Sequence, residues 1–362
     1  MKTMNIESNL LKSLGESLEA VPNAYLGEIS LETGMGAGLR PDAILEAVVA
    51  GHEIAFLVET RGDVYPRDAR EIVWQLKRSL RELESSNRRY VPMILARSIS
   101  EGAQEFLQEE QVAYHDLSGS LFVSVGETFV LIERPKPKRA KRRAMNVFKG
   151  TRAQVLHALF DRPGEWVSGL ELAENAAVSP ATVSETLKDL ERRDWLDVEG
   201  EGPAKRRRLV QPDVLLDAWR DAILAAPPSK RTRYYVPRMK PEDLARKIER
   251  NNHHDDVDLE FTGQFAAQTY APFLSSVSDL TVRTFGKSAQ NRLISTLGAR
   301  EVSEGANLVV IEGKPNKVRR RMYDTNERFL ASPLQIYLDL LEDHGRSKEM
   351  AEHLRSQKLV WK

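Results

Sequence analysis

Apolar runs alternate with amphipathic stretches over the first third of the chain. Residues 43–50 (AILEAVVA) and 53–60 (EIAFLVET) predict two strands, and Gly51-His52 between them predicts a hairpin. Residues 67–83 carry apolar side chains at helical spacing and predict a helix. The same patterns then predict a strand over 90–96, a helix over 100–108 with Ser100 as its N-cap, a strand around Tyr114 and a strand over 121–132. This order predicts an N-terminal α/β domain.

The middle of the chain has more sharply marked element boundaries. The pattern predicts, in order, a helix over 151–160, a short strand over 165–167, a helix over 170–176 and a third helix from Ser179-Pro180. Ser179 and Pro180 mark that start because Ser is a favoured N-cap and Pro suits the first helical position. Two further strands flank the Gly-Glu-Gly-Pro turn at 200–203. Residues 149–212 are therefore predicted to form a winged helix-turn-helix.

The third helix of this segment has two distinct faces. Val183, Leu187 and Leu190 recur at four and three residues and should face the core. The opposite face should present Ala181, Ser184, Glu185 and Lys188, with Thr182 at its flank. Small and hydroxylated side chains allow close approach to base edges in the major groove, and cations contact phosphates. The predicted contacts to double-stranded DNA are Ser179, Thr182, Ser184 and Lys188 on the helix and Lys205, Arg206, Arg207 and Arg208 on the wing.

Charge is balanced over the whole chain but clustered locally. The chain has 53 basic and 53 acidic residues, so attraction for nucleic acid must come from clusters. The strongest cluster is PKPKRAKRR at 135–143, where two prolines disfavour a regular helix. It is interpreted as a linker directly before the helix-turn-helix, either a solvated tether or an arm that contacts phosphates. The phosphate contacts predicted for such an arm are Lys138, Arg139, Lys141, Arg142 and Arg143.

Composition excludes several classes of protein. The absence of cysteine rules out disulfides and thiolate metal sites, and the adjacent His253 and His254 are explained by a polar loop. No stretch approaches the roughly 20 apolar residues of a membrane helix, and residues 1–14 lack the order of a signal peptide. A cytoplasmic protein without cofactor or membrane contact is expected.

The last part of the chain predicts a mixed α/β domain. Its predicted elements are helices over 214–223, 262–270, 333–342 and 346–354 and strands over 280–285 and 307–312. The expected fold class is multidomain α/β. The expected domains are 1–134, an α/β domain; 135–148, a basic linker; 149–212, the winged helix-turn-helix; and 213–362, a C-terminal α/β domain.

The N-terminal pattern resembles the PD-(D/E)xK restriction-endonuclease-like fold. The resemblance covers about residues 20–132 and rests on the element order, on Pro41-Asp42 before the first strand and on Glu59-Thr60-Arg61 at the end of the second. It implies that the carboxylates of Asp42 and Glu59 hold Mg²⁺ and that a lysine activates water. Here Arg61 stands at the lysine position, and arginine keeps its proton at physiological pH, so it cannot act as a base. We expect a retained fold without nuclease activity.

The C-terminal sequence resembles the AbiEi-type antitoxins of type IV toxin-antitoxin systems. The resemblance covers about residues 148–362 and rests on FTGQFAAQTYAPF at 261–273 and ASPLQIYLDLLEDHGRSKEMAEHLR at 331–355. It implies repression of the protein's own operon through the winged helix and a nucleotidyltransferase toxin as partner. The N-terminal unit is a departure, because the smallest antitoxins of this kind begin at the winged helix.

Three hypotheses about function follow. The first is a sequence-specific transcriptional regulator, an autorepressor that binds an inverted repeat as a homodimer or as monomers on successive half-sites. The second is a metal-dependent nuclease that uses Asp42 and Glu59, and the third is a plasmid replication or partition protein. Further cations in the C-terminal domain could extend the DNA contact, meet an acidic partner or form a solvated face; they are Lys230, Arg231, Arg233, Lys317 and Arg319 to Arg321. The first hypothesis is preferred, and an enzyme is not expected.

Overall fold

The protein is a mixed α/β protein in which the elements gather into two compact units. The structure, a computed structural model, describes residues 2–31, 41–83, 88–135, 145–251, 258–313, 322–323 and 329–361. One unit comprises Met1–Val147 with Leu187–Asp197, and the other comprises Phe148–Thr186 with Val198–Lys362. Within the described residues, no helix has the length and apolar character needed to cross a membrane.

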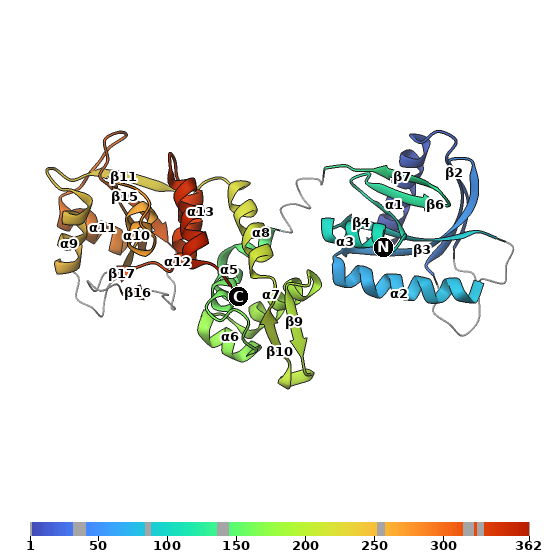
Figure 1. The fold of residues 1–362 in the computed structure, drawn as a ribbon, viewed down its shortest axis with the longest axis horizontal. Coiled ribbons are helices and arrows are strands. Elements are labelled where there is room, and N and C mark those ends of the chain that lie inside the picture. Colours follow the sequence, from blue (N-terminus) through green and yellow to red (C-terminus); the bar gives the residue numbers. More distant parts are fainter. Residues whose placement is uncertain are drawn as a thin grey trace. The chain divides into compact units, whose positions relative to one another are not determined.

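The strands of the N-terminal unit form one mixed sheet that follows chain order, β1 to β7 (Figure 1). Its strands are β1 (Tyr25–Leu31), β2 (Ala43–Val49), β3 (His52–Val64), β4 (Tyr90–Ile99), β5 (Ala113–Asp116), β6 (Leu121–Val125) and β7 (Thr128–Ile132). β4 is parallel to both β3 and β5, and the other neighbours are antiparallel. Parallel neighbours need a crossover connection, and helices α2 (Pro66–Leu83) and α3 (Glu101–Glu109) supply the two crossovers.

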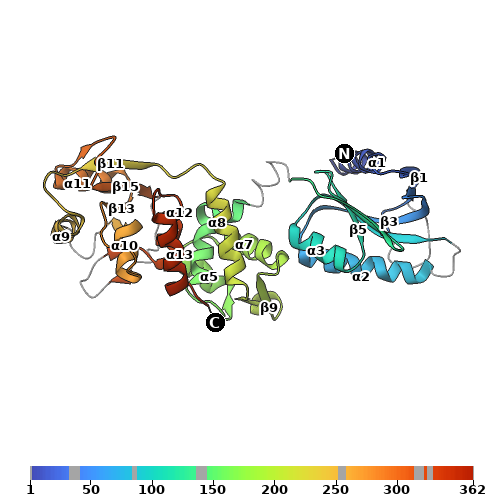
Figure 2. The ribbon, with the colours of Figure 1, turned by 45° about the horizontal axis from the view of Figure 1, so that its top comes forward.

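Helices cover both faces of this sheet. Figure 2 shows α1 (Lys2–Glu19) on one side and α2 with α3 on the other. Alternate residues of β3 belong to the two cores: Phe56 packs in the cluster that includes Leu14 of α1, and Leu57 packs in the cluster that includes Ile72 of α2. A strand buried on both faces shows a continuous apolar run, which explains the sequence IAFLV at 54–58.

The predicted elements of this unit are present, with differences at the hairpin turn, at the ends of β3 and β4 and within residues 121–132. The hairpin turn lies at Ala50-Gly51, both with positive φ (51° and 82°), and β3 continues to Val64, four residues beyond the predicted end. The single strand predicted over 121–132 is wrong, because a turn at Gly126-Glu127 divides it into β6 and β7. Neither α1 nor β1 was predicted.

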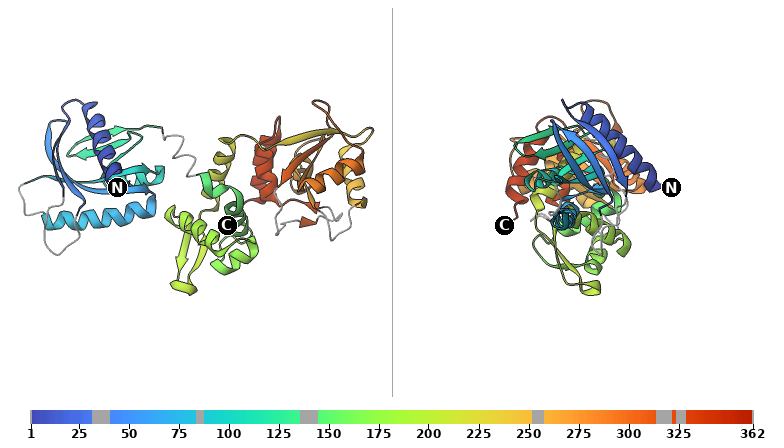
Figure 3. Two further views of the ribbon diagram at one scale, coloured as in Figure 1. Left: turned by 180° about the vertical axis from the view of Figure 1, so that it is seen from behind. Right: turned by 90° about the vertical axis from the view of Figure 1, so that its right-hand side faces the viewer.

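The central segment, defined here as residues 145–209, contains the predicted alternation of helices and short strands. Its elements are a 3₁₀ turn (Met145–Phe148), α5 (Gly150–Phe160), β8 (Val167–Ser168), α6 (Gly169–Ala176), α7 (Pro180–Arg192), β9 (Leu196–Glu199), a 3₁₀ turn (Gly202–Ala204) and β10 (Arg206–Leu209). The strands form a small sheet in the order β8-β10-β9. β9 and β10 make a hairpin that projects from the helices, which the left view of Figure 3 also shows in yellow-green.

The rest of the chain adds a second mixed sheet in the order β14-β11-β15-β13-β12-β17-β16. Its strands are β11 (Arg231–Tyr235), β12 (Leu259–Thr262), β13 (Leu280–Phe285), β14 (Arg300–Glu301), β15 (Leu308–Gly313), β16 (Met322–Tyr323) and β17 (Phe329–Leu330). The pairs β13 with β15 and β12 with β17 are parallel. β12 is buried at every position and β13 at most, as expected for strands with helices on both sides.

Six helices accompany the described part of this sheet. They are α8 (Pro212–Leu224), α9 (Pro241–Asn251), α10 (Gly263–Tyr270), α11 (Lys287–Leu297), α12 (Pro333–Leu341) and α13 (Ser347–Lys358). α12 begins as predicted, with Ser332 Oγ accepting from the Gln335 amide at 3.2 Å. β11, α9, β12 and α11 were not predicted. The spacing of Val214, Leu215, Trp219 and Ile223 predicts that Val214 lies on the apolar face of the helix over 214–223, but Val214 is 48% exposed, so this prediction is wrong.

An aromatic cluster joins α8 to α5. The Trp219 ring of α8 lies 5.1 Å from the ring of His157 and 6.3 Å from that of Phe160, and Phe160 lies 5.1 Å from Trp361. Arg355 of α13 in turn pairs with Asp217 of α8, Nη1 to Oδ1 at 2.5 Å. Helix α5 is thus packed directly against the start and the end of the C-terminal part of the chain.

Candidate functional site

Helix caps fix the ends of α6 and α7. Ser168 Oγ accepts from the Glu171 amide at 3.2 Å while the Glu171 carboxylate accepts from the Ser168 amide at 2.7 Å, which is a capping box. α6 ends at Ala177 in the left-handed conformation, with φ 47°. Ser179 Oγ then accepts from the Thr182 amide at 3.2 Å at the start of α7. The turn between the helices is therefore set by local hydrogen bonds, at the positions that the sequence predicts.

The two faces of α7 separate as predicted. Val183, Leu187 and Leu190 are each 0% exposed. The predicted outward residues Ala181, Ser184, Glu185 and Lys188 are exposed, as is Ser179, and Thr182 is half-buried. Thr182 also contacts Ser179, Oγ1 to Oγ at 3.0 Å, and its carbonyl accepts from Thr186 Oγ1. The surface of α7 near its N-terminus is thus open, with the small Ser179, Ala181 and Ser184 exposed beside the acidic Glu185.

The four wing cations lie together on β10 and at its start, but they have different contacts. Arg206 Nη2 donates to the carbonyl of Trp166 at 2.8 Å, and the Arg208 guanidinium stacks over the Trp166 ring at 4.9 Å. Arg207 Nη1 donates to the carbonyl of Lys205 at 3.2 Å. Arg206 and Arg207 sit in register with Ser168 and Val167 of β8. Arg206 and Arg208 therefore also hold the hairpin against the segment that precedes α6.

The other predicted cations are placed differently. Two groups of these cations lie outside the described residues: Lys138, Arg139, Lys141, Arg142 and Arg143 of the linker, and Lys317 and Arg319 to Arg321. The adjacent His253 and His254 also lie outside them. Lys230 and Arg233 are exposed. Arg231 is not a surface cation: its side chain is 13% exposed, Nη2 donates to the carbonyl of Asp339, and Nη1 pairs with Asp343 at 3.4 Å.

The three residues of the nuclease-like motif come together at the junction of β2 and β3. Arg61 Nη1 lies 2.8 Å from Glu59 Oε2 and 3.7 Å from Asp42 Oδ2. Asp42 Oδ2 also accepts from the Thr60 amide at 2.7 Å and from Thr60 Oγ1 at 2.8 Å. Both carboxylates thus face one guanidinium. The residues do not fit a divalent metal as they stand, because the Arg61 cation already lies against both carboxylates, and the described residues contain no group of three metal-ligating side chains.

Two buried titratable groups of this unit have shifted pKa values of opposite kind. Burial, reinforced by the charge of Asp42 and partly offset by Arg61, raises the pKa of Glu59 from 4.5 to about 7. Burial lowers the pKa of His115 from 6.5 to about 4, against the influence of Asp116. His115 is 0% exposed, and its Nε2 lies 3.0 Å from Ser13 Oγ. Asp116 itself accepts from the Ser118 amide at 2.9 Å, in a turn where Gly119 has φ 87°.

These shifts predict that Glu59→Gln changes how stability depends on pH. Because the pKa of Glu59 is raised in the folded protein, the free energy of unfolding decreases as pH rises from 4.5 to about 7. Because the pKa of His115 is lowered, the free energy of unfolding decreases as pH falls from 6.5 to about 4. At about 1.4 kcal/mol per pKa unit, each group changes the free energy of unfolding by about 3 kcal/mol. Between about pH 5 and 6 the two changes have opposite signs as pH rises. In the Glu59→Gln variant the free energy of unfolding should therefore rise more steeply from pH 4.5 to 6.5 than in the wild type.

Urea denaturation of both proteins across this range measures the difference. Parallel pH profiles for wild type and Glu59→Gln would show that Glu59 titrates with an ordinary pKa and that its environment is not the buried one described above.

A buried ionic cluster in the C-terminal domain was missed by sequence reasoning. Arg283 of β13 pairs with Asp339 of α12 and lies 3.8 Å, Nε to Oε1, from Glu260 of β12. Asp339 Oδ2 accepts from Thr262 Oγ1 at 2.6 Å, and Oδ1 accepts from Gln335 Nε2 at 2.9 Å. Burial lowers the pKa of Arg283, but the charges of Asp339 and Glu260 outweigh it and keep the pKa above its ordinary value. The sequence does contain a signal for this cluster, because Arg283 and Asp339 are single charged residues within the mainly apolar elements LTVRTF and PLQIYLDLL.

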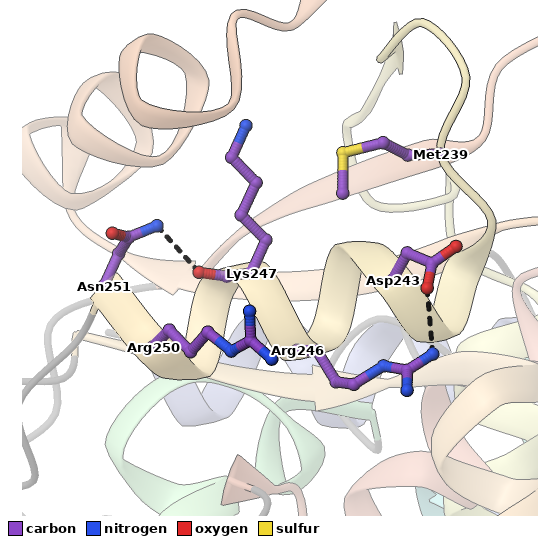
Figure 4. Close-up of a pocket in the computed structure, with 6 residues that line it drawn as sticks. All are labelled: Met239, Asp243, Arg246, Lys247, Arg250 and Asn251. Carbon is purple, nitrogen blue, oxygen red and sulfur yellow. Dashed lines mark hydrogen bonds and ion pairs between the residues drawn. The ribbon is translucent and has the colours of Figure 1, made fainter.

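A pocket of about 450 Å³ lies along α9, lined by Met239, Asp243, Arg246, Lys247, Arg250 and Asn251 (Figure 4). Arg246 Nη2 donates to Asp243 Oδ1 at 2.8 Å, so this cation is paired. Within the described part of the chain, Lys247 and Arg250 have no acidic partner. Asn251 Nδ2 donates to the carbonyl of Lys247 at 2.8 Å at the end of the helix. The pocket is open and predominantly cationic, a character suited to anionic groups.

Comparison with known proteins locates a family in the C-terminal part. Residues 208–360 match the model of the family described as "Transcriptional regulator, AbiEi antitoxin, Type IV TA system". Comparisons with curated proteins and with solved structures gave no match. The matched residues begin in β10 and include both sequence stretches on which the AbiEi resemblance rests, as well as the Arg283–Asp339 cluster. Residues 208–360 of this chain are therefore similar to the AbiEi antitoxins, a family of type IV transcriptional regulators.

Proposed function

We propose that the protein is a sequence-specific double-stranded DNA-binding regulator whose central segment is a winged helix-turn-helix. The observation that carries the proposal is the division of α7 into a fully buried face and an exposed face with Ser184 and Lys188, directly before a hairpin with four cations. In winged helix-turn-helix proteins the second helix of the motif enters the major groove and cations of the wing contact phosphates. The AbiEi match over residues 208–360, a family of transcriptional regulators, supports this role.

The roles of the residues follow from their chemistry. Ser184, at the centre of the exposed face, can donate to or accept from a base edge, and Thr182 flanks it. Ser179 at the N-cap, Lys188 and the wing cations Lys205 to Arg208 contact phosphates. The basic linker residues Lys138, Arg139, Lys141, Arg142 and Arg143 extend this contact along the duplex. The operator is an inverted repeat upstream of the protein's own gene, occupied by a homodimer or by two monomers.

The second part of the proposal concerns regulation and rests on the similarity of residues 208–360 to AbiEi antitoxins. We infer that the protein represses its own operon and that a nucleotidyltransferase toxin is its partner, as the AbiEi resemblance implies. The N-terminal unit is proposed to have the restriction-endonuclease-like fold, supported by the parallel pairing of β3 with β4 through α2 and by the proximity of Asp42 and Glu59. Because Arg61 lies against both carboxylates, this unit is proposed to be without nuclease activity.

Sequence preference tests the assignment of α7. Ser184→Ala removes the central hydroxyl of the exposed face and is expected to relax the preference at one base pair of each half-site by about 1 kcal/mol, the lower end of the range for a base contact, because one hydroxyl makes a single hydrogen bond. A panel of operator duplexes with single base-pair changes, measured by fluorescence anisotropy, reports this. Ser356→Ala on α13, an exposed serine outside the central segment, is the matched control. Identical preference profiles for wild type and Ser184→Ala would remove Ser184 from the interface.

A further inference from the structure

The Asp42–Glu59 pair of the N-terminal unit already contains a cation, the guanidinium of Arg61. Arg61 Nη1 contacts Glu59 Oε2 at 2.8 Å and lies 3.7 Å from Asp42 Oδ2, so its charge faces both carboxylates at once. The same Nη1 donates to the carbonyl of Thr60 at 2.8 Å, which fixes the guanidinium beside the strand. Mg²⁺ bound by both carboxylates would need oxygen distances of about 2.0 to 2.1 Å, whereas Arg61 Nη1 already lies 2.8 Å from Glu59 Oε2 and 3.7 Å from Asp42 Oδ2.

The surroundings of the pair support a fixed internal cation. Glu59 is 7% exposed, and a buried carboxylate is stable only when it is paired or protonated. Asp42 Oδ2 accepts two hydrogen bonds from Thr60, so the oxygen nearer to Arg61 is already engaged. The Arg61 side chain is 40% exposed, whereas the side chain of its partner Glu59 is 9% exposed. Arginine stays charged at every physiological pH and donates in a fixed planar geometry, so it offsets the charge of one carboxylate of the pair.

We propose that Arg61 is a built-in replacement for a divalent metal ion, and that shortening or neutralising this one side chain turns the Asp42–Glu59 pair into a metal-binding site. The inference goes beyond the DNA-binding function of the central segment and is independent of it. It assigns the N-terminal unit a metal-independent role, in which the ion pair holds β2 and β3 together where a metalloenzyme would hold its cofactor.

The test compares Mn²⁺ binding by the full-length wild type and two variants. Arg61→Gln removes the charge, and Arg61→Lys keeps a charge on a flexible stem that can withdraw into solvent. Both variants are expected to bind one Mn²⁺ at least about tenfold more tightly than the wild type, measured by isothermal titration calorimetry and by the loss of the free Mn²⁺ signal in electron paramagnetic resonance. Saturating Mn²⁺ should also raise the Tm of the variants, because a ligand that binds only the folded state stabilises it. The wild type should show no such rise at the same ionic strength.

Two control variants separate this proposal from general effects. Glu59→Gln combined with Arg61→Gln removes one ligand and should abolish the gained Mn²⁺ binding. Arg97→Gln breaks the neighbouring ion pair with Asp63, which spans β3 and β4 at 2.7 Å, and should bind Mn²⁺ no better than the wild type. If Arg61→Gln does not fold, Arg61→Lys still decides the question. Tight Mn²⁺ binding by the wild type that Glu59→Gln abolishes, or no gain in a folded Arg61 variant, would overturn the proposal.

Discussion

Asp339→Ala is expected to destabilise the C-terminal domain by about 3 kcal/mol, the lower end of the cost of breaking a buried ion pair. Asp339 is 3% exposed and accepts hydrogen bonds from Arg283, Thr262 and Gln335. Its removal leaves the Arg283 guanidinium buried, with Glu260 at 3.8 Å as a remaining charge partner. That partner is the reason to expect the lower end of the range. The donors of Thr262 and Gln335 also lose their acceptor.

Hydrogen exchange of the amides of β13 and α12 in increasing urea measures the opening of this domain apart from the rest of the chain. Asp343→Ala is the matched control, because Asp343 pairs with Arg231 at 3.4 Å and its side chain is 24% exposed. It should cost less than about 1 kcal/mol. The double variant Arg283→Met with Asp339→Leu should recover most of the lost stability, because apolar residues can replace a buried ion pair. Equal costs for Asp339→Ala and Asp343→Ala would contradict the role given to the cluster.

Removing two cations from the proposed DNA interface should weaken binding to every duplex and flatten its dependence on salt. The variant Lys188→Ala with Lys205→Ala takes one cation from α7 and one from the start of the wing strand. Each lost phosphate contact lowers the slope of log K against log salt by about 0.9, so the double variant should lower it by about 1.8. At physiological salt this corresponds to about a tenfold to hundredfold loss of affinity, for operator and unrelated DNA alike.

The matched control is Lys348→Ala with Lys358→Ala, which removes the same charge from exposed positions of α13. Its salt slope should equal that of the wild type. Arg208→Ala is less suited to the comparison, because its guanidinium stacks on Trp166 and its loss also loosens the hairpin. Equal slopes for the Lys188–Lys205 variant and its control would place the phosphate contacts elsewhere.

The sequence predicted the elements whose signals are local. α7 was predicted because Ser179-Pro180 marks its start and because Val183, Leu187 and Leu190 define one face, and all of these features are present. The hairpin of β2 and β3 was predicted because two apolar runs flank Gly51-His52, which is also a local signal. α9 and α11 were not predicted, although α9 has a clear apolar face with Leu244 and Ile248 buried. β11 and β12 are short strands that form only through pairing with residues far away in the sequence, such as Ile311 with Arg231, and no local signal reports such pairing.

In the candidate sites, too, the sequence predicts the features that depend on local pattern and misses those that depend on tertiary packing. Asp42, Glu59 and Arg61 could be expected to meet, because Glu59 and Arg61 share a face of one strand and Asp42 begins its neighbour. That Arg61 pairs with both carboxylates depends on its rotamer, which the sequence does not specify. The buried cluster of Arg283, Glu260 and Asp339 joins three elements and depends on how β12, β13 and α12 pack. The stacking of Arg208 on Trp166 depends likewise on the register of β10 with β8.

We propose that this protein binds DNA in a sequence-specific manner through a winged helix-turn-helix formed by its central segment. DNase I footprinting of the full-length protein on the DNA upstream of its own gene tests it most directly. We predict a protected inverted repeat, whose protection Lys188→Ala with Lys205→Ala removes and Lys348→Ala with Lys358→Ala retains. Absence of protection at protein concentrations where the fold is intact, or protection that survives the loss of Lys188 and Lys205 unchanged, would contradict the claim.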